Sequence, residues 1–164
     1  MQWVKALYLR NFIFGVEDSL ASTVGLLSGI AAAGVGASAI IATGAVLIFV
    51  EAFSMAVGSF VSEESAEEYV KHKDVSSREP LMGSIVMFAS YILSGLIPLL
   101  PYLFWEVDAA LKISVGLSLV ALFLLGMIGA EFAKTNKLKH GIKMLAIGGV
   151  AIVAGVIVGG LFKV

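Results

Sequence analysis

Five long apolar stretches divide the chain, and they are separated by short turns or charged segments. They lie at residues 12–33, 38–61, 81–104, 110–130 and 141–162. Each has at least about 20 residues, which is enough to cross a hydrocarbon core of about 30 Å at 1.5 Å per residue. They are too long for strands and lack the alternation of barrel strands. The pattern predicts an all-α integral membrane protein, with residues 1–164 forming a single membrane domain of five transmembrane helices.

The composition supports this prediction and narrows the function. Hydrophobic residues make up 59% of the 164 residues and charged residues 14%, whereas a soluble domain has about 25% charged residues. A soluble domain of this size cannot bury so much apolar surface. These numbers exclude a water-soluble enzyme or a nucleic-acid binder with a basic face, and they require a lipid bilayer as the partner.

No residue pattern points to catalysis. The chain has no cysteine, which excludes disulfides and thiol chemistry. It has no nucleophile elbow, phosphate-binding loop or dinucleotide-binding glycine motif following a strand. We therefore expect no enzymatic activity, no catalytic residue and no permanently bound cofactor.

The basic residues define a topology. Nine of the 11 Lys and Arg residues fall at the same end of the predicted bundle: Lys5, Arg10, Lys71, Lys73, Arg78, Lys134, Lys137, Lys139 and Lys143. The positive-inside rule then places the N-terminus and the loop 62–80 in the cytoplasm, and the C-terminus outside. Tyr102 and Trp105 are expected in the outer aromatic belt. Five helices of this length rarely enclose a pathway alone, so we also expect a homo-oligomer.

Three acidic residues, Glu17, Asp18 and Glu51, fall inside predicted spans. A carboxylate in the middle of a membrane helix costs about 2.5–3.5 kcal/mol, and such a residue usually faces a cavity or a partner. Glu17 and Asp18 are close enough to the cytoplasmic end to extend toward water. Glu51 is too central to do so, and it is either a functional carboxylate or a protonated structural one.

The first span carries a polar and small-residue face. Helical periodicity places Asp18, Ser22, Gly25 and Gly29 on one side of the helix. Gly25 and Gly29 form a GxxxG motif, which allows close helix packing in lipid. The face is either a packing seam only or a close helix pair, such as a dimer seam, whose inward carboxylates and Ser22 hydroxyl suit a cation.

Met55 lies one helical turn after Glu51. A lone methionine is usually core filler. A thioether beside carboxylates is instead a mixed soft and hard ligand set, which favours a transition metal over Mg²⁺ or Ca²⁺. Both interpretations remain open for Met55.

An acidic segment continues the second span into the predicted cytoplasmic loop. Its candidate cation ligands are Glu63, Glu64, Glu67, Glu68 and His72. Helical spacing stacks Glu64, Glu68 and His72 on one face, where like charges repel unless they are neutralised. The segment is either a solvated helix paired with nearby lysines or a site that collects cations from the cytoplasm.

Four sequence segments together resemble the vacuolar iron transporter family over about residues 12–162. They are Phe14–Leu20 with Gly25–Gly29, Ala52–Ser62, Gly95–Tyr102, and the pairs Leu125-Gly126 and Gly148-Gly149. The resemblance implies a five-span homodimer whose pathway lies between the two first spans. It implies transport of Fe²⁺ or Mn²⁺ out of the cytoplasm in exchange for protons. Asp18 matches the first-span aspartate of the family, and Met55 matches its second-span methionine.

The chain also departs from the family pattern. Ser19 stands where glycine is usual, and Asn11, Leu47 and Ser59 stand at positions that carry an acid in the family or in its plant-like members. Glu51 instead places a carboxylate one turn beyond position 47. The loop 62–80 is too short for the large cytoplasmic metal-binding domain, although its glutamates occupy the start of that region.

The sequence therefore predicts a short-form Fe²⁺ or Mn²⁺ exporter that works by proton antiport along a dimer axis. Without an organelle-targeting segment in the sequence, we expect the plasma membrane of a prokaryote. Two alternatives remain, namely a passive cation channel and a non-transporting membrane assembly protein whose intramembrane acids are structural.

Overall fold

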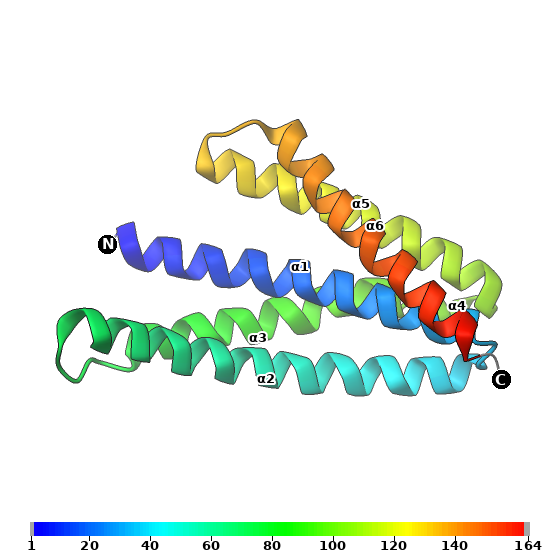
Figure 1. The fold of residues 1–164 in the computed structure, drawn as a ribbon, viewed down its shortest axis with the longest axis horizontal. Helices are drawn as coiled ribbons and strands as arrows, with labels where there is room; N and C mark the ends of the chain where they lie inside the picture. Colours follow the sequence, from blue (N-terminus) through cyan, green and yellow to red (C-terminus); the bar gives the residue numbers. More distant parts are fainter. Residues whose placement is uncertain (1, 163–164) are drawn as a thin grey trace.

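The computed structural model describes residues 2–162, which form helices joined by short turns (Figure 1). The helices are α1 (Gln2–Ala32), α2 (Ala37–Lys71), α3 (Arg78–Leu99), α4 (Pro101–Phe104), α5 (Val107–Ala133) and α6 (Lys137–Leu161). Five of them are long and apolar enough to cross a membrane. The described residues contain no strand. The predicted class of an all-α, five-span membrane protein is confirmed.

The helix boundaries differ from the predicted spans at three places. α1 begins at Gln2 instead of residue 12, and α2 continues to Lys71 instead of ending at residue 61. The added part of α2 is rich in Glu and Ala, which favour helix even where the chain has left the apolar stretch. The third stretch breaks after Leu99, because Pro101 has no N–H group with which to continue the helix and instead begins α4.

The turns follow from local chemistry. Gly34 has a φ of 88° in the tight turn between α1 and α2, a conformation that favours glycine. At the start of α6, the side chain of Asn136 accepts a hydrogen bond from the Lys139 backbone N–H at 3.0 Å and caps the helix. These short connections keep neighbouring helices antiparallel.

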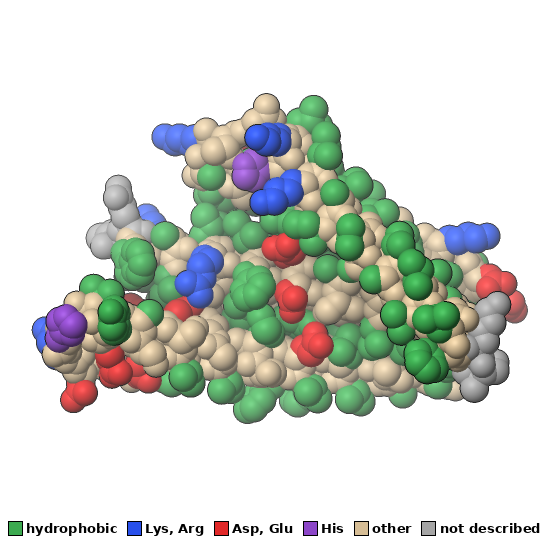
Figure 2. All heavy atoms as spheres, in the orientation of Figure 1, with side chains coloured by type: hydrophobic (Ala, Val, Ile, Leu, Met, Phe, Trp, Pro, Cys, Tyr) green, Lys and Arg blue, Asp and Glu red, His purple; other side chains and the backbone are tan. Residues whose placement is uncertain are grey.

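α1 is the central helix of the bundle. It packs against α3 on one side and α6 on another, and it also touches α2 and α5. Figure 1 shows α1, α2 and α3 side by side, with the α5–α6 hairpin crossing them at an angle. The N-terminus, the α2–α3 loop and the α5–α6 turn lie at one end, where basic side chains gather in Figure 2. This grouping matches the predicted charge distribution, whereas the membrane orientation stays a prediction.

Backbone contact holds α1 and α6 together. A Cβ atom added to Gly155 would lie 2.0 Å from the Gly25 carbonyl oxygen, and one added to Gly159 would lie 1.8 Å from that of Gly29. Glycine is therefore required on α6, because any side chain there would force the two backbones apart. The close packing predicted for Gly25 and Gly29 is thus seen inside one chain.

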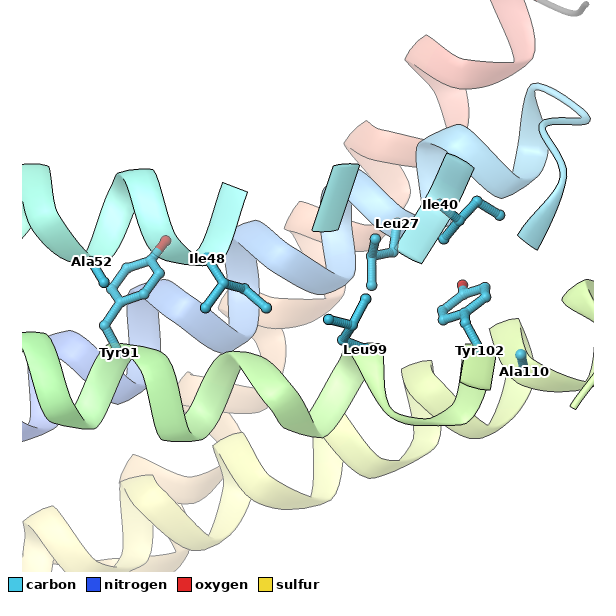
Figure 3. Close-up of a cluster of buried hydrophobic side chains, with 8 residues drawn as sticks. All are labelled: Leu27, Ile40, Ile48, Ala52, Tyr91, Leu99, Tyr102 and Ala110. Atoms are coloured by element: carbon cyan, nitrogen blue, oxygen red, sulfur yellow. The ribbon is translucent and has the colours of Figure 1, made fainter. Parts of the chain in front are cut away.

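A cluster of buried side chains joins α1 to α5 (Figure 3). It includes Leu27, Ile48, Tyr91 and Tyr102. Tyr102 is only 2% exposed, so it belongs to this core and the prediction of a membrane-belt position for it is wrong. Trp105 is 50% exposed and remains available to an interface. The outer faces of the helices carry many exposed Phe, Leu, Ile and Val side chains, as a protein surrounded by lipid requires.

Candidate ion-transport site

Three helices bring polar side chains together midway along the molecule. Ser22 of α1, Glu51 of α2 and Tyr91 of α3 form a hydrogen-bonded triad. The Ser22 hydroxyl donates to Glu51 Oε2 at 3.2 Å, and it lies 2.8 Å from the Tyr91 hydroxyl. Tyr91 also donates to Glu51 Oε2. Glu51 is thus held by neighbours on two other helices.

Asp18 completes the polar region from α1, one turn before Ser22. Its carboxylate interacts electrostatically with that of Glu51, and both side chains are half-buried. Figure 2 shows acidic side chains midway along the molecule, on the face formed by α1, α2 and α6. The two acids that sequence reasoning singled out on different helices are therefore neighbours in space.

This pair of carboxylates is not a complete metal site within one chain. The described residues contain no group of three or more His, Cys, Asp or Glu side chains arranged to hold a metal ion. A transported divalent ion would need further oxygen or sulfur ligands, supplied by hydroxyl groups, Met55, water or a second subunit.

An apolar groove runs away from the triad between α1 and α6. Its volume is about 650 Å³, and Ser22 lines it together with small residues of both helices. These residues include Gly25, Gly29, Ala151, Ala154, Gly155 and Gly159. Gly25 and Gly29, the residues predicted for the dimer seam, pack on α6 of the same chain. The dimer seam itself stays a prediction.

Met55 and Glu17 lie outside the triad. Met55 is half-buried and packs against the apolar core, one turn along α2 from Glu51. Glu17 is half-buried, and its carboxylate interacts with Asp18 and with Lys143 of α6. Glu17 is thus close to a lysine of α6, whereas its predicted direction relative to the Asp18 face stays a prediction.

Glu63 does not lie with the other glutamates of the acidic segment. Its side chain is buried among α1, α2 and α3, where Oε1 accepts hydrogen bonds from Asn11 at 2.7 Å and Ser59 at 2.9 Å. Arg10 adds an ion pair at 3.4 Å. The buried Oε2 has no hydrogen-bond partner among the described residues. The expected grouping of Glu63 with a solvent-facing capture site is therefore corrected, because Glu63 continues the buried stripe of α2 that contains Ser59.

The rest of the acidic segment is exposed or half-buried, and part of it is paired. Glu64 accepts a hydrogen bond from Ser77 at 2.5 Å, and Glu67 forms an ion pair with Lys71. His72 has a left-handed backbone with φ 52° and caps α2 through its N–H bond to the Glu68 carbonyl. The predicted stack of Glu64, Glu68 and His72 on one helix face is therefore broken at His72.

Sequence reasoning missed Tyr91 and the role of Asn11 in the buried cluster. Asn11 is fully buried, and it joins Glu63 and Ser59. A signal for Tyr91 was present, since a tyrosine in the middle of an apolar span needs a partner for its hydroxyl. Which carboxylate it would meet depends on how α2 and α3 pack.

Comparison with known proteins identifies the family. The model of the VIT family matches residues 9–79 and 70–160, which together cover most of the chain. The chain belongs to the VIT family.

Several proteins are similar to this VIT-family protein over most of their length. Vacuolar iron transporter homolog 4 of Arabidopsis thaliana is 30% identical over 159 residues, covering 88% of this chain and 78% of the relative. VIT-like transporter 1b of Glycine max is 26% identical over 166 residues, covering 90% and 72%. An uncharacterized protein of Methanocaldococcus jannaschii is 26% identical over 155 residues, covering 84% and 81%. The resemblance noted from sequence motifs is confirmed.

Proposed function

We propose that this VIT-family protein transports a divalent transition-metal ion, Fe²⁺ or Mn²⁺, across a membrane. The observation that carries the proposal is the polar region midway along the bundle, where Glu51 is hydrogen-bonded to Ser22 and Asp18 lies one turn before Ser22. Carboxylates in a membrane are costly unless they serve an ion or a partner. Relatives named as iron transporters support the choice of cargo. Oxygen ligands with a nearby thioether at Met55 are compatible with either ion.

The proposed direction is export from the cytoplasm in exchange for protons. Two neighbouring carboxylates repel each other when both are ionised, and either a proton or a divalent cation relieves that repulsion. A cation that arrives between them displaces protons, so binding of one ion and release of the other are linked. This linkage is the physical basis of the proposed antiport.

We further propose a homodimer in the plasma membrane of a prokaryote. A second subunit seated along the α1–α6 groove would cover its small, apolar lining and bring a second Ser22 and Asp18 toward the first. The archaeal relative supports a prokaryotic location. Protons, the metal ion, the lipid bilayer and a second copy are then the partners of the chain.

Uptake of metal into proteoliposomes tests the proposal. The wild-type protein should accumulate Fe²⁺ or Mn²⁺ in a manner that depends on a pH gradient, with Co²⁺ and Zn²⁺ measured in parallel. Asp18→Asn keeps the shape of the side chain and removes its charge, so uptake should fall to the level of empty vesicles while the protein stays assembled. Metal flux without pH dependence would favour the channel alternative, and absence of flux in the wild type would favour the assembly-protein alternative.

A further inference from the structure

Tyr91 is the one member of the triad that no sequence motif indicated. We propose that Tyr91 is a positioning residue that holds one carboxylate oxygen of Glu51, and that this restraint makes the site prefer small divalent ions to Ca²⁺. The inference rests on the proposed function, because it concerns which ions the Asp18 and Glu51 pair accepts.

Both hydroxyl groups of the triad converge on the same oxygen of Glu51. Tyr91 and Ser22 each donate to Oε2, and the two hydroxyls lie 2.8 Å from each other. No described residue donates to Oε1, and this atom is not among the fully buried oxygens that lack a partner. Glu51 therefore presents one occupied oxygen and one free, accessible oxygen.

Tyr91 is the rigid partner in this arrangement. Its side chain is 0% exposed and lies in the core cluster with Ile48 and Ala52. Figure 3 shows its ring rising from α3 toward α2 beside Ala52. Its backbone carbonyl oxygen accepts a hydrogen bond from the Ser19 hydroxyl of α1 at 2.7 Å. The ring and the backbone are both fixed, so the position of the phenol oxygen is set by packing.

The restraint has a consequence for ion choice. A carboxylate with one oxygen occupied by two hydrogen bonds can bind a cation through the other oxygen only. Ca²⁺ takes six to eight oxygen ligands and often uses both oxygens of a carboxylate, whereas smaller ions with octahedral preference are served by single oxygens. The Tyr91 hydroxyl thus removes a binding mode that Ca²⁺ uses and that Mn²⁺ does not require.

The test compares Tyr91→Phe with Tyr102→Phe. Tyr102 is also buried, but its hydroxyl makes no hydrogen bond to Glu51, so Tyr102→Phe controls for the loss of a buried hydroxyl. Uptake of Mn²⁺ is measured with the full chain in proteoliposomes, with Ca²⁺ as competitor. For Tyr91→Phe the Ca²⁺ concentration that halves Mn²⁺ uptake should fall about tenfold, because both oxygens of Glu51 then become available to Ca²⁺. The half-saturating Mn²⁺ concentration should change much less, and Tyr102→Phe should leave both values unchanged.

A double-mutant cycle separates positioning from general packing. The cycle is read from Mn²⁺ and Ca²⁺ binding in detergent. When Glu51→Gln is already present, Tyr91→Phe should cause no further change in the ion preference of binding, because the restrained oxygen is no longer a carboxylate. If Tyr91→Phe does not fold, Ser22→Ala tests the same oxygen, and Ser28→Ala is its matched control because the buried Ser28 hydroxyl has no described partner. Equal shifts for Mn²⁺ and Ca²⁺, additive effects in the cycle, or the same shift in Tyr102→Phe would each overturn the inference.

Direct Mn²⁺ and Ca²⁺ binding, measured by titration calorimetry in detergent, distinguishes this inference from the proposed function. Binding whose ion preference depends on Tyr91, without any uptake, would support the inference and overturn the proposed transport. If the wild type takes up metal and Tyr91→Phe has the same ion preference, the inference is overturned and the proposed function stands. Absence of both binding and uptake would overturn both.

Discussion

At the scale of single residues, a substitution of Met55 can separate its packing from its proposed role as a metal ligand. Met55 packs against the core, yet it lies one turn from Glu51. Met55→Leu nearly conserves volume and removes only the soft sulfur donor, so packing alone predicts a cost below about 1.5 kcal/mol. We expect uptake of Fe²⁺ to fall by more than the accompanying loss of thermal stability explains. Equal uptake by the variant and the wild type would show that Met55 contributes to packing only.

Glu63 was expected in a solvent-facing site for cation capture, but its side chain is buried. Its carboxylate ties α2 to Asn11 and Arg10 of α1, so Glu63→Gln should lower the free energy of unfolding by about 1–3 kcal/mol. The measurement is denaturant or thermal unfolding in detergent. Glu68→Gln is the matched control, because that side chain makes no hydrogen bond with any described residue and should change stability by less than about 0.5 kcal/mol. A stability loss shared by both variants would contradict the structural assignment of Glu63.

The half-buried acids of the segment remain candidates for cation collection. If Glu64, Glu67 and Glu68 gather ions from the cytoplasm, their joint replacement by Gln should raise the half-saturating metal concentration more than it lowers the maximal rate. The reason is that the pathway between Asp18 and Glu51 is unchanged. An unaltered concentration dependence would identify the segment as a solvated helix.

At the scale of elements, the contact between α1 and α6 depends on glycine. Gly155→Ala would place a Cβ atom 2.0 Å from the Gly25 carbonyl oxygen. Because the obstacle is backbone, the helices must separate, and we expect a destabilisation of about 1–3 kcal/mol and a lower melting temperature in detergent. Gly149→Ala on the same helix meets nothing within 4 Å and should leave stability unchanged or slightly raised. A melting temperature for Gly155→Ala equal to that of Gly149→Ala would refute this packing.

At the scale of the whole molecule, the absence of cysteine offers a clean test of the dimer. Ala154 lines the α1–α6 groove, so Ala154→Cys should form a disulfide-linked dimer in the membrane under mild oxidation. Val120→Cys on the lipid-facing surface of α5 should remain monomeric on a non-reducing gel, since Val120 is 57% exposed and outside the groove. Cross-linking of Val120→Cys but not of Ala154→Cys would contradict an interface at the α1–α6 groove and indicate one on α5.

The sequence by itself determined the class of the protein and its five apolar helices. The length of each apolar stretch, compared with the thickness of the bilayer, leaves almost no other solution. These are local properties, because each is set within a single continuous stretch of chain. The family motifs are local in the same sense.

Only the tertiary structure decided which polar groups meet. The Glu63 side chain is buried with Asn11 and Ser59, apart from the other glutamates of its segment. Tyr91 of α3 donates a hydrogen bond to Glu51 of α2. A buried polar group must find a hydrogen-bond partner wherever packing supplies one, and in a helical bundle that partner sits on another helix. Its identity is set by helix rotation and register, which depend on close contacts such as that between Gly25 and Gly155.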